Sequence, residues 1–248
     1  MTTTTSIRAV IRPPADPLRR TSLAAGILYL LTFVSVPTLA LYQDARNDAG
    51  FVLGAGSGNG VLLAAGTEVV VAVTCIGTAV VFFPVLRRQS ETAAIGFLAS
   101  RVTEGALIIV GVVSVLTLFT LRTDVAGTAD ADPASLVTAG HALSATYDWT
   151  FLLSQSLMPV FNALFLGHAL YRSGLVPRIL PVIGLAGAPL LLASDVAIFF
   201  GVYDRAAPIA LLAALPIAAW EFSLGVYLVV RGFRPSAVAA LSPAQAVR

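Results

Sequence analysis

Six apolar stretches alternate with short polar segments along the chain. They cover residues 22–42, 61–86, 92–121, 149–171, 179–201 and 207–230. A helix needs about 20 apolar residues to cross the hydrocarbon core of a bilayer, so each stretch is long enough to span it. Only helices and closed barrels satisfy every backbone hydrogen bond in lipid. The pattern predicts an all-α polytopic membrane protein, a bundle of six transmembrane helices with short loops, in one domain over residues 21–231.

The segments outside this bundle differ in composition. Residues 1–20 are rich in Thr, Pro and Arg and predict a disordered cytoplasmic leader, whereas residues 232–248 predict a cytoplasmic tail. The longest loop, residues 122–148, separates the third span from the fourth. Within it, Asp132-Pro133 is typical of an N-cap followed by proline at the first helical position. We expect a short interfacial helix there, leading into the fourth span.

Single residues predict where some spans begin, bend or end. Ser90 precedes the third span, and its hydroxyl can accept a hydrogen bond from a free backbone N–H of the first turn. Gly174 follows the fourth span, where a left-handed residue commonly closes a helix. Pro37 lies inside the first span and is expected to kink it.

Composition and charge agree with a membrane protein and orient it. Hydrophobic residues make up 57% of the chain and charged residues 11%, which lies outside the range of soluble domains. With a cytoplasmic amino terminus, the inside segments hold Arg8, Arg12, Arg19, Arg20, Arg87, Arg88, Arg172, Arg178, Arg231, Arg234 and Arg248, and the outside loops hold Arg46, Arg122 and Arg205. This positive-inside bias predicts a multi-pass protein with both termini in the cytoplasm. Because the arginines cluster near span ends rather than in one patch, nucleic-acid binding is not expected.

The third span carries a short polar run at its centre, Ser100-Arg101-Val102-Thr103-Glu104. A charge at this depth costs about 2.5–3.5 kcal/mol on insertion scales, so it needs a partner or a function. Arg101 and Glu104 are three residues apart and share one face of a helix, within pairing distance. Three further acids lie inside other spans, namely Glu68, Asp195 and Glu221. We expect Arg101 to pair with one or two carboxylates and the remaining acids to be protonated.

The neighbours of these acids predict a shared interior. Small residues recur at helical spacing beside Glu68, Asp195 and Glu221, which lets helices approach closely in a membrane. On the fourth span, Asp148, Gln155 and Asn162 recur every seven residues and join the same face. We therefore expect one buried polar cluster of Glu68, Arg101, Glu104, Asp195 and Glu221, supported by Ser100, Asp148, Gln155 and Asn162.

Two hypotheses explain such a cluster. In the first, the protein is a small-molecule or proton-coupled transporter in which the four acids bind a proton or cation and Arg101 is their counter-ion, because ionisable residues inside membranes often mark such paths. In the second, the protein is a non-catalytic membrane scaffold or partner-binding protein, and the cluster only fixes helix register. Beyond the lipid bilayer, the sequence names no partner, and the oligomeric state stays open.

Motifs for catalysis are lacking, so an intramembrane enzyme is disfavoured. The glycine-rich run at residues 54–60 does not end in the GK[ST] of a phosphate-binding loop, and no HExxH zinc motif occurs. The single Cys75 allows neither an intramolecular disulfide nor a cysteine metal cluster. No catalytic residue, cofactor or metal is predicted.

Four runs carry a family resemblance: AGILYLLTFVS at residues 25–35, GTAVVFFPVL at 77–86, ASRVTE at 99–104 and LVPR at 175–178. They are similar to an uncharacterised bacterial membrane family, domain of unknown function 4386, over residues 21–234. The resemblance implies a six-span integral protein of the bacterial cytoplasmic membrane. It implies no activity, substrate or catalytic residue.

Overall fold

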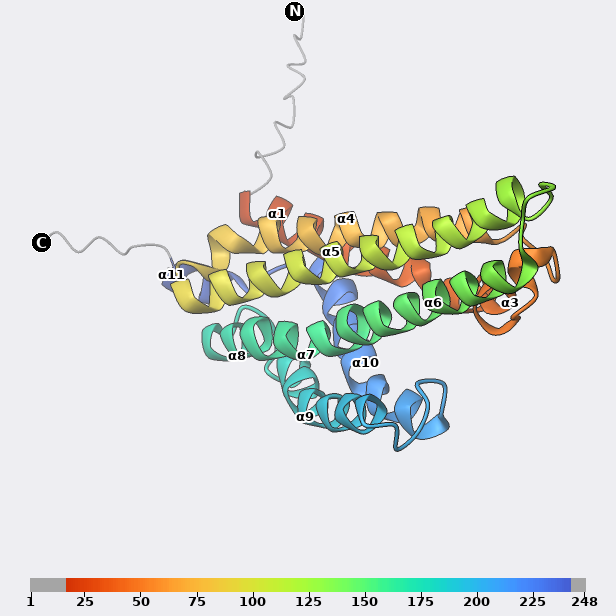
Figure 1. Cartoon of the computed structure of the whole chain (residues 1–248). Helices are drawn as coiled ribbons and strands as arrows, with labels where there is room; N and C mark the ends of the chain where they lie inside the picture. Colours follow the sequence, from red (N-terminus) through yellow and green to blue (C-terminus); the bar gives the residue numbers. More distant parts are fainter. Residues whose placement is uncertain (1–16, 242–248) are drawn as a thin grey trace, which may run out of the picture.

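The computed structural model describes residues 17–241, and within that range it is helical, with no strand (Figure 1). Residues 1–16 and 242–248 lie outside the described residues, and with them most of the predicted leader and part of the predicted tail. Residues 17–20 of that leader form the first turn of a helix, and residues 235–241 of the tail form another.

The helices follow one another with short connections. In chain order they are α1 (Pro17–Leu31), η1 (Thr32–Ser35), α2 (Thr38–Leu41), α3 (Gln43–Asn47), η2 (Phe51–Leu53), α4 (Val61–Leu86), α5 (Glu91–Thr120), η3 (Leu121–Val125), α6 (Pro133–Phe151), η4 (Leu152–Leu157), α7 (Met158–Asn162), η5 (Ala163–Gly167), α8 (His168–Ser173), α9 (Ile179–Phe199), α10 (Pro208–Val230) and α11 (Pro235–Leu241). We call the end of the bundle with α11 the terminal end, and the opposite end, with α3 and residues 126–132, the loop end (Figure 1).

Five helices in the described residues are long and apolar enough to cross a membrane. They correspond to the second through sixth predicted spans and confirm a polytopic helical bundle. The first predicted span, residues 22–42, is helical in pieces. Its α-helix ends at Leu31, a 3-10 turn follows, and α2 begins after Pro37. Proline lacks the N–H that a continuing helix needs and clashes with the preceding turn, which explains the break near Pro37.

The loop-end part of the fourth span corrects one expectation. Instead of a separate interfacial helix, Pro133–Ser173 is one continuous helix of 41 residues that contains the π-helical segments η4 and η5. Pro159 is the second residue after η4 and cannot donate a backbone hydrogen bond, so the regular α-helical pattern is interrupted there. Because Arg205, in the loop between α9 and α10, pairs with Asp148, the first part of α6 extends beyond that loop.

Predicted helix ends are confirmed at three places. The Asp132 carboxylate accepts from the backbone N–H of Ala134 and Ser135, with Pro133 at the first helical position. The Ser90 hydroxyl accepts from Ala93 N–H at 3.2 Å. Gly174 closes α8 with a φ of +65°, a left-handed conformation that glycine adopts without strain.

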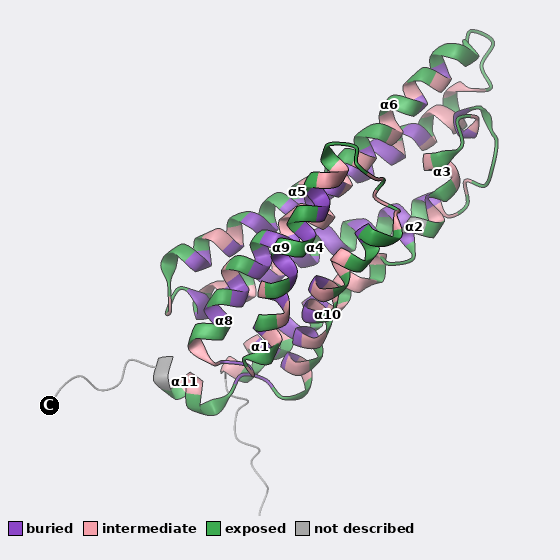
Figure 2. Ribbon diagram, turned by 90° about the horizontal axis from the view of Figure 1, so that it is seen from below, coloured by how far each residue is buried: buried purple, intermediate pink, exposed green. Residues whose placement is uncertain are grey.

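The outward faces of the long helices are apolar. Figure 2 shows buried positions on the inward faces and exposed positions outside. Large aliphatic side chains such as Leu63, Val73 and Val80 on α4 are 63%, 62% and 59% exposed. A monomeric soluble protein rarely exposes apolar surface on this scale. The chain is therefore an integral membrane protein.

Two hydrophobic clusters fill the interior. The terminal-end cluster centres on Phe82, Phe97 and Trp220, and the loop-end cluster on Phe51 and Ile108. Helices approach closely where they pack around these clusters. A Cβ added to Gly26 would lie 2.8 Å from the Gly225 carbonyl oxygen, and one added to Gly105 would lie 2.9 Å from that of Ala72. These contacts hold α1 against α10 and α4 against α5.

Candidate functional site

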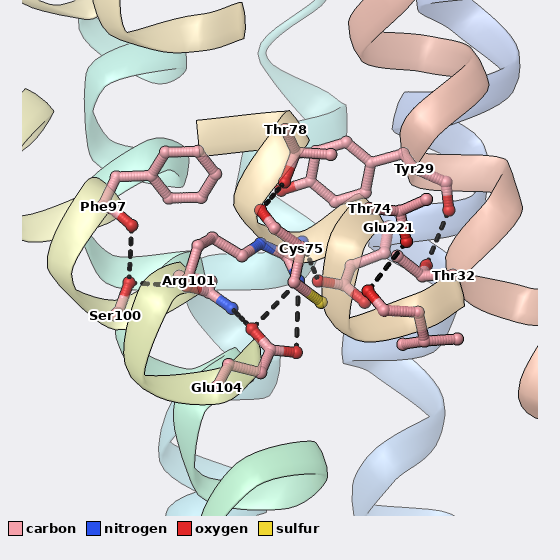
Figure 3. Close-up of polar contacts among 12 residues, drawn as sticks. Tyr29, Thr32, Thr74, Cys75, Thr78, Phe97, Ser100, Arg101, Glu104 and Glu221 are labelled. Carbon is pink, nitrogen blue, oxygen red and sulfur yellow. Dashed lines mark hydrogen bonds and ion pairs between the residues drawn. The ribbon is translucent and has the colours of Figure 1, made fainter. Parts of the chain in front are cut away.

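Arg101 lies at the junction of the two hydrophobic clusters and binds two carboxylates. Its Nη1 donates to Oε1 and Oε2 of Glu104 at 3.2 and 3.0 Å, and its Nη2 donates to Oε1 of Glu221 at 3.1 Å (Figure 3). The Arg101 side chain is 1% exposed, that of Glu104 6% and that of Glu221 13%. Arg101 and Glu104 are one helical turn apart on α5, whereas Glu221 reaches them from α10.

Glu104 is held from a third side by α7. Asn162 donates from Nδ2 to Glu104 Oε2 at 2.7 Å, and the Asn162 Oδ1 accepts from the Ser100 hydroxyl at 2.6 Å. The Ser100 hydroxyl also bonds to the Phe97 carbonyl one turn earlier at 3.0 Å. Ser100 and Asn162 are therefore part of the structure around the ion pair.

Aromatic rings and a thiol complete the surroundings of the guanidinium. The carbon Cζ of Arg101 lies 4.8 Å from the ring centre of Tyr29 and 5.8 Å from that of Phe97. Its Nη1 is 3.5 Å from the Cys75 sulfur. Ring faces attract cations, and the attraction is stronger away from water. We call Tyr29, Cys75, Ser100, Arg101, Glu104, Asn162 and Glu221 the Arg101 network.

Glu68 does not reach this network and forms a second group closer to the loop end. Its Oε1 accepts from the Tyr147 hydroxyl at 2.7 Å and from Gln155 Nε2 at 3.4 Å. Its Oε2 is buried and has no hydrogen-bond partner among the described residues. The same holds, within residues 17–241, for the buried hydroxyl of Tyr42, which neighbours Glu68 and whose ring packs edge-on against Tyr147 at 5.2 Å. Glu68, Tyr42, Tyr147 and Gln155 are called the Glu68 group.

Two arginines and one aspartate lie above the Glu68 group at the loop end. Asp148 Oδ1 accepts from Arg46 Nη2 at 2.6 Å and from Arg205 Nη2 at 3.1 Å. The Arg46 guanidinium lies over the Tyr147 ring at 5.4 Å, and that of Arg205 over Phe151 at 4.0 Å. Burial and the neighbouring Arg46 lower the pKa of Arg205, while Asp148 opposes the shift. We call Arg46, Asp148 and Arg205 the Asp148 triad.

Asp195 belongs to neither the Arg101 network nor the Glu68 group and forms the third group of buried acids, on α9. Its Oδ1 accepts from the Ser156 hydroxyl at 2.5 Å, and within the described part of the chain its buried Oδ2 has no partner. The neighbouring Ser194 hydroxyl accepts from Tyr203 at 2.9 Å. The expectation of one cluster is thus wrong: the four acids inside the spans are divided among three groups, and Arg101 pairs with only Glu104 and Glu221. Asp148 lies outside these groups, in the Asp148 triad.

One helix contacts all three groups. The continuous helix Pro133–Ser173 supplies Tyr147 and Gln155 to Glu68, Ser156 to Asp195 and Asn162 to Glu104. Gln155 and Ser156 belong to the π-helical segment η4. A π turn shifts the side chains that follow it around the helix axis and is frequent at functional sites. The polar side chains of this helix therefore set the arrangement of the buried acids.

Several site residues were not singled out by the sequence. Tyr147 lies eight residues before Gln155, a helical spacing that could have placed both on one face. Tyr29 and Ser156 carry no comparable signal. The sequence predicts Arg46 and Arg205 only as charges in exposed loops, because nothing in their spacing indicates that they fold back over Tyr147 and Phe151. In the described residues, no three His, Cys, Asp or Glu side chains gather as a metal site.

Comparison with known proteins identifies the family and no activity. Neither a curated protein nor a solved structure matches the chain. Residues 24–232 match the family described as domain of unknown function, DUF4386. The match includes all the long helices, the three groups of buried acids and the Asp148 triad, so the chain belongs to the DUF4386 family.

Proposed function

We propose that the protein is a proton-coupled carrier of small molecules in the bacterial cytoplasmic membrane, with Glu68 as its proton-binding group. The observation that carries this proposal is the state of the Glu68 carboxyl group. It is 1% exposed, and no cation forms an ion pair with it within residues 17–241. The Tyr42 hydroxyl lies next to the carboxyl group, yet the buried Oε2 has no well-formed hydrogen bond within the described residues. When Oε2 carries a proton, it can donate a hydrogen bond to the oxygen of the neighbouring Tyr42 hydroxyl.

The position of Glu68 supports exchange of this proton with the loop-end side. The Asp148 triad lies between the Glu68 group and the loop end, and Arg46 covers the ring of Tyr147, whose hydroxyl binds Glu68. Separation of Arg46 or Arg205 from Asp148 would open this cover. Asp148 is half exposed, so water reaches the triad from outside.

The other direction is closed by packing. On the terminal side of Arg101, the rings of Phe82, Phe97 and Trp220 are fully buried. One cavity of about 30 Å³ lies beside Arg46, and another of about 420 Å³ lies between α9 and α10. No buried acid lines either cavity. Carriers pass through such occluded conformations when access alternates between the two sides of a membrane.

Orientation follows from the arginines. The loops of the terminal end contain Arg87, Arg88, Arg172 and Arg178. The loop end contains Arg46 and Arg205, which pair with Asp148, and Arg122, which binds the Phe51 carbonyl. The positive-inside rule supports an orientation in which the terminal end and both termini are in the cytoplasm. Glu68 exchanges its proton with the extracytoplasmic side in this orientation.

A structural role is the second candidate, and the Arg101 network favours it. Both oxygens of Glu104 accept hydrogen bonds, and the arginine is sealed from water. The Arg101 Nε and the Tyr29 hydroxyl have no partner in the described residues, but ion pairs held in this way can serve only to fix how helices pack. In this alternative the chain is a scaffold or partner-binding protein, and Glu68 never changes its protonation.

Infrared difference spectroscopy on protein in lipid nanodiscs tests the proposal without knowledge of the substrate. A pH step should produce a carboxyl C=O band from Glu68 that is absent in Glu68→Gln. The same variant in proteoliposomes should lose the proton uptake that follows an imposed pH gradient, reported by an entrapped pH-sensitive dye.

Glu91→Gln is the matched control, because Glu91 is an exposed glutamate at the start of α5. It should leave both signals unchanged. A band that persists in Glu68→Gln, or wild-type protein with no titrating carboxyl band, would overturn the proposal in favour of the structural role.

A further inference from the structure

An apolar groove lies between α9 and α10 on the outside of the bundle. It has a volume of about 420 Å³ and is lined by Leu180, Phe222, Ser223, Val226, Tyr227, Val230 and Arg231. Ligand pockets commonly measure about 300–1,000 Å³, so the groove is of ligand size. The Ser223 hydroxyl already donates to the Trp220 carbonyl at 3.1 Å, which leaves the groove apolar up to Arg231.

The groove matches one leaflet of a bilayer in length. Phe222 and Arg231 are nine residues apart, and a helix rises 1.5 Å per residue, so they are separated by about 14 Å along α10. Half of a hydrocarbon core of about 30 Å has nearly the same thickness. Phe222 therefore lies near the bilayer centre when Arg231 is at the headgroup level.

Charge at the headgroup level favours an anion. Arg231 is exposed, and its side chain has no hydrogen bond or ion pair with any described residue. Arg178, two residues before Leu180, lies at the start of α9 at the same end of the bundle. The loops and helix starts of the terminal end contain a single described acid, Glu91, which belongs to α5.

We infer that this groove binds one anionic glycerophospholipid of the leaflet at the terminal end, with an acyl chain along α10 and the phosphate at Arg231. Basic sites between transmembrane helices on the cytoplasmic side bind anionic headgroups in this way. The site is separate from the buried acids, so it does not depend on the proposed transport function. It anchors the junction of α9 and α10, the two helices that carry Asp195 and Glu221.

Native mass spectrometry of the full chain in detergent, titrated with phosphatidylglycerol or phosphatidylcholine of the same acyl chains, tests the inference. Wild-type protein should retain phosphatidylglycerol more tightly. Arg231→Gln should weaken that retention about fivefold, the effect of one arginine near an anionic headgroup. Val226→Trp, which fills the groove without a change of charge, should reduce the retention of both lipids.

Arg88→Gln is the control, because Arg88 is an exposed arginine of the same end that does not line the groove. It should retain phosphatidylglycerol as the wild type does. Equal retention of the two lipids by wild-type protein, or retention unchanged by both groove variants, would overturn the inference. Dimers that dissociate in Val226→Trp would also overturn it, because they would assign the groove to a second copy of the chain.

Discussion

Asn162 and Arg101 donate to the same oxygen of Glu104, at 2.7 and 3.0 Å. Asn162 thereby joins α7 to the charged centre of α5. Replacement by leucine removes this donor and the acceptor of the Ser100 hydroxyl, while it keeps the approximate volume. We expect Asn162→Leu to lower the free energy of unfolding by about 1–3 kcal/mol, the cost of leaving buried polar groups unpaired.

Unfolding in mixed detergent micelles measures this effect. Phe161→Leu is the matched control. Phe161 precedes Asn162 and is 38% exposed, so its replacement should have little effect on stability. Equal stability of Asn162→Leu and wild type would contradict the assigned hydrogen bonds.

Arg101 compensates two carboxylates at once, so its removal should be among the costliest single changes in the chain. Arg101→Met leaves Glu104 and Glu221 buried beside each other without a cation, and loss of one partner of a buried pair typically costs about 3–5 kcal/mol. The triple variant with Glu104→Gln and Glu221→Gln removes the uncompensated charges and should recover most of that loss.

Thermal unfolding of the two Arg101 variants should be compared with that of Arg88→Met, which removes an exposed arginine without a partner in the described chain. The control should be close to wild type. A triple variant as unstable as Arg101→Met would show that packing of the arginine side chain, rather than its charge, matters at this place.

Helix positions could be predicted from the sequence because lipid imposes a simple constraint. A span must be apolar and about 20 residues long, which identified α4, α5, α9 and α10 nearly to their ends. The same rule does not predict the break in the first span or the start of α6. Pro37 divides a stretch that hydropathy alone presents as continuous, and the helix from Pro133 crosses polar residues that hydropathy assigns to a loop.

Contacts between the acids were harder to predict, because helical spacing gives a face but not a depth or a neighbour. Arg101 and Glu104 are on one helix, and their pairing followed from the spacing. The partners of Glu68 depend on where the continuous helix Pro133–Ser173 places Tyr147 and Gln155, which π turns and loop lengths determine. The periodicity of α4 and α5 predicts neither the π turns nor the effect of loop length.

Close packing of α1 against α10 depends on the absence of a side chain at Gly26. A Cβ there would meet the backbone of Val229 as well as the Gly225 oxygen, both at 2.8 Å, so the helices must separate. We expect Gly26→Ala to lower stability by about 1–3 kcal/mol, the usual cost of overpacking. Resistance to unfolding in mixed micelles provides the measurement.

Gly66→Ala is the control for Gly26→Ala. Gly66 is exposed in the interior of α4, and a Cβ there meets nothing within 4 Å, so alanine should be neutral or should stabilise the helix by about 0.5–1 kcal/mol. If both substitutions had the same effect, the assigned approach of α1 to α10 would be wrong.

The N-cap of α6 should make the first turn of this helix sensitive to acid. The Ser135 hydroxyl and the backbone N–H groups of Ser135 and Ala134 bind the Asp132 carboxylate and hold its pKa below the ordinary value of 3.8. A depressed pKa in the folded state contributes stability above the ordinary pKa, and this contribution is lost as the pH falls through the folded value. Hydrogen exchange of residues 134–138 should therefore accelerate at pH below about 4, beyond the intrinsic change in exchange chemistry.

Asp132→Asn separates charge from capping in this experiment. Asparagine is also a good N-cap but does not titrate, so the variant should keep protection of the first turn and lose its dependence on acid. Asp132→Ala should lose protection at every pH. Acid-dependent exchange that persists in Asp132→Asn would assign the effect to another group, and the exposed Asp130, two residues earlier, would be the next residue to replace.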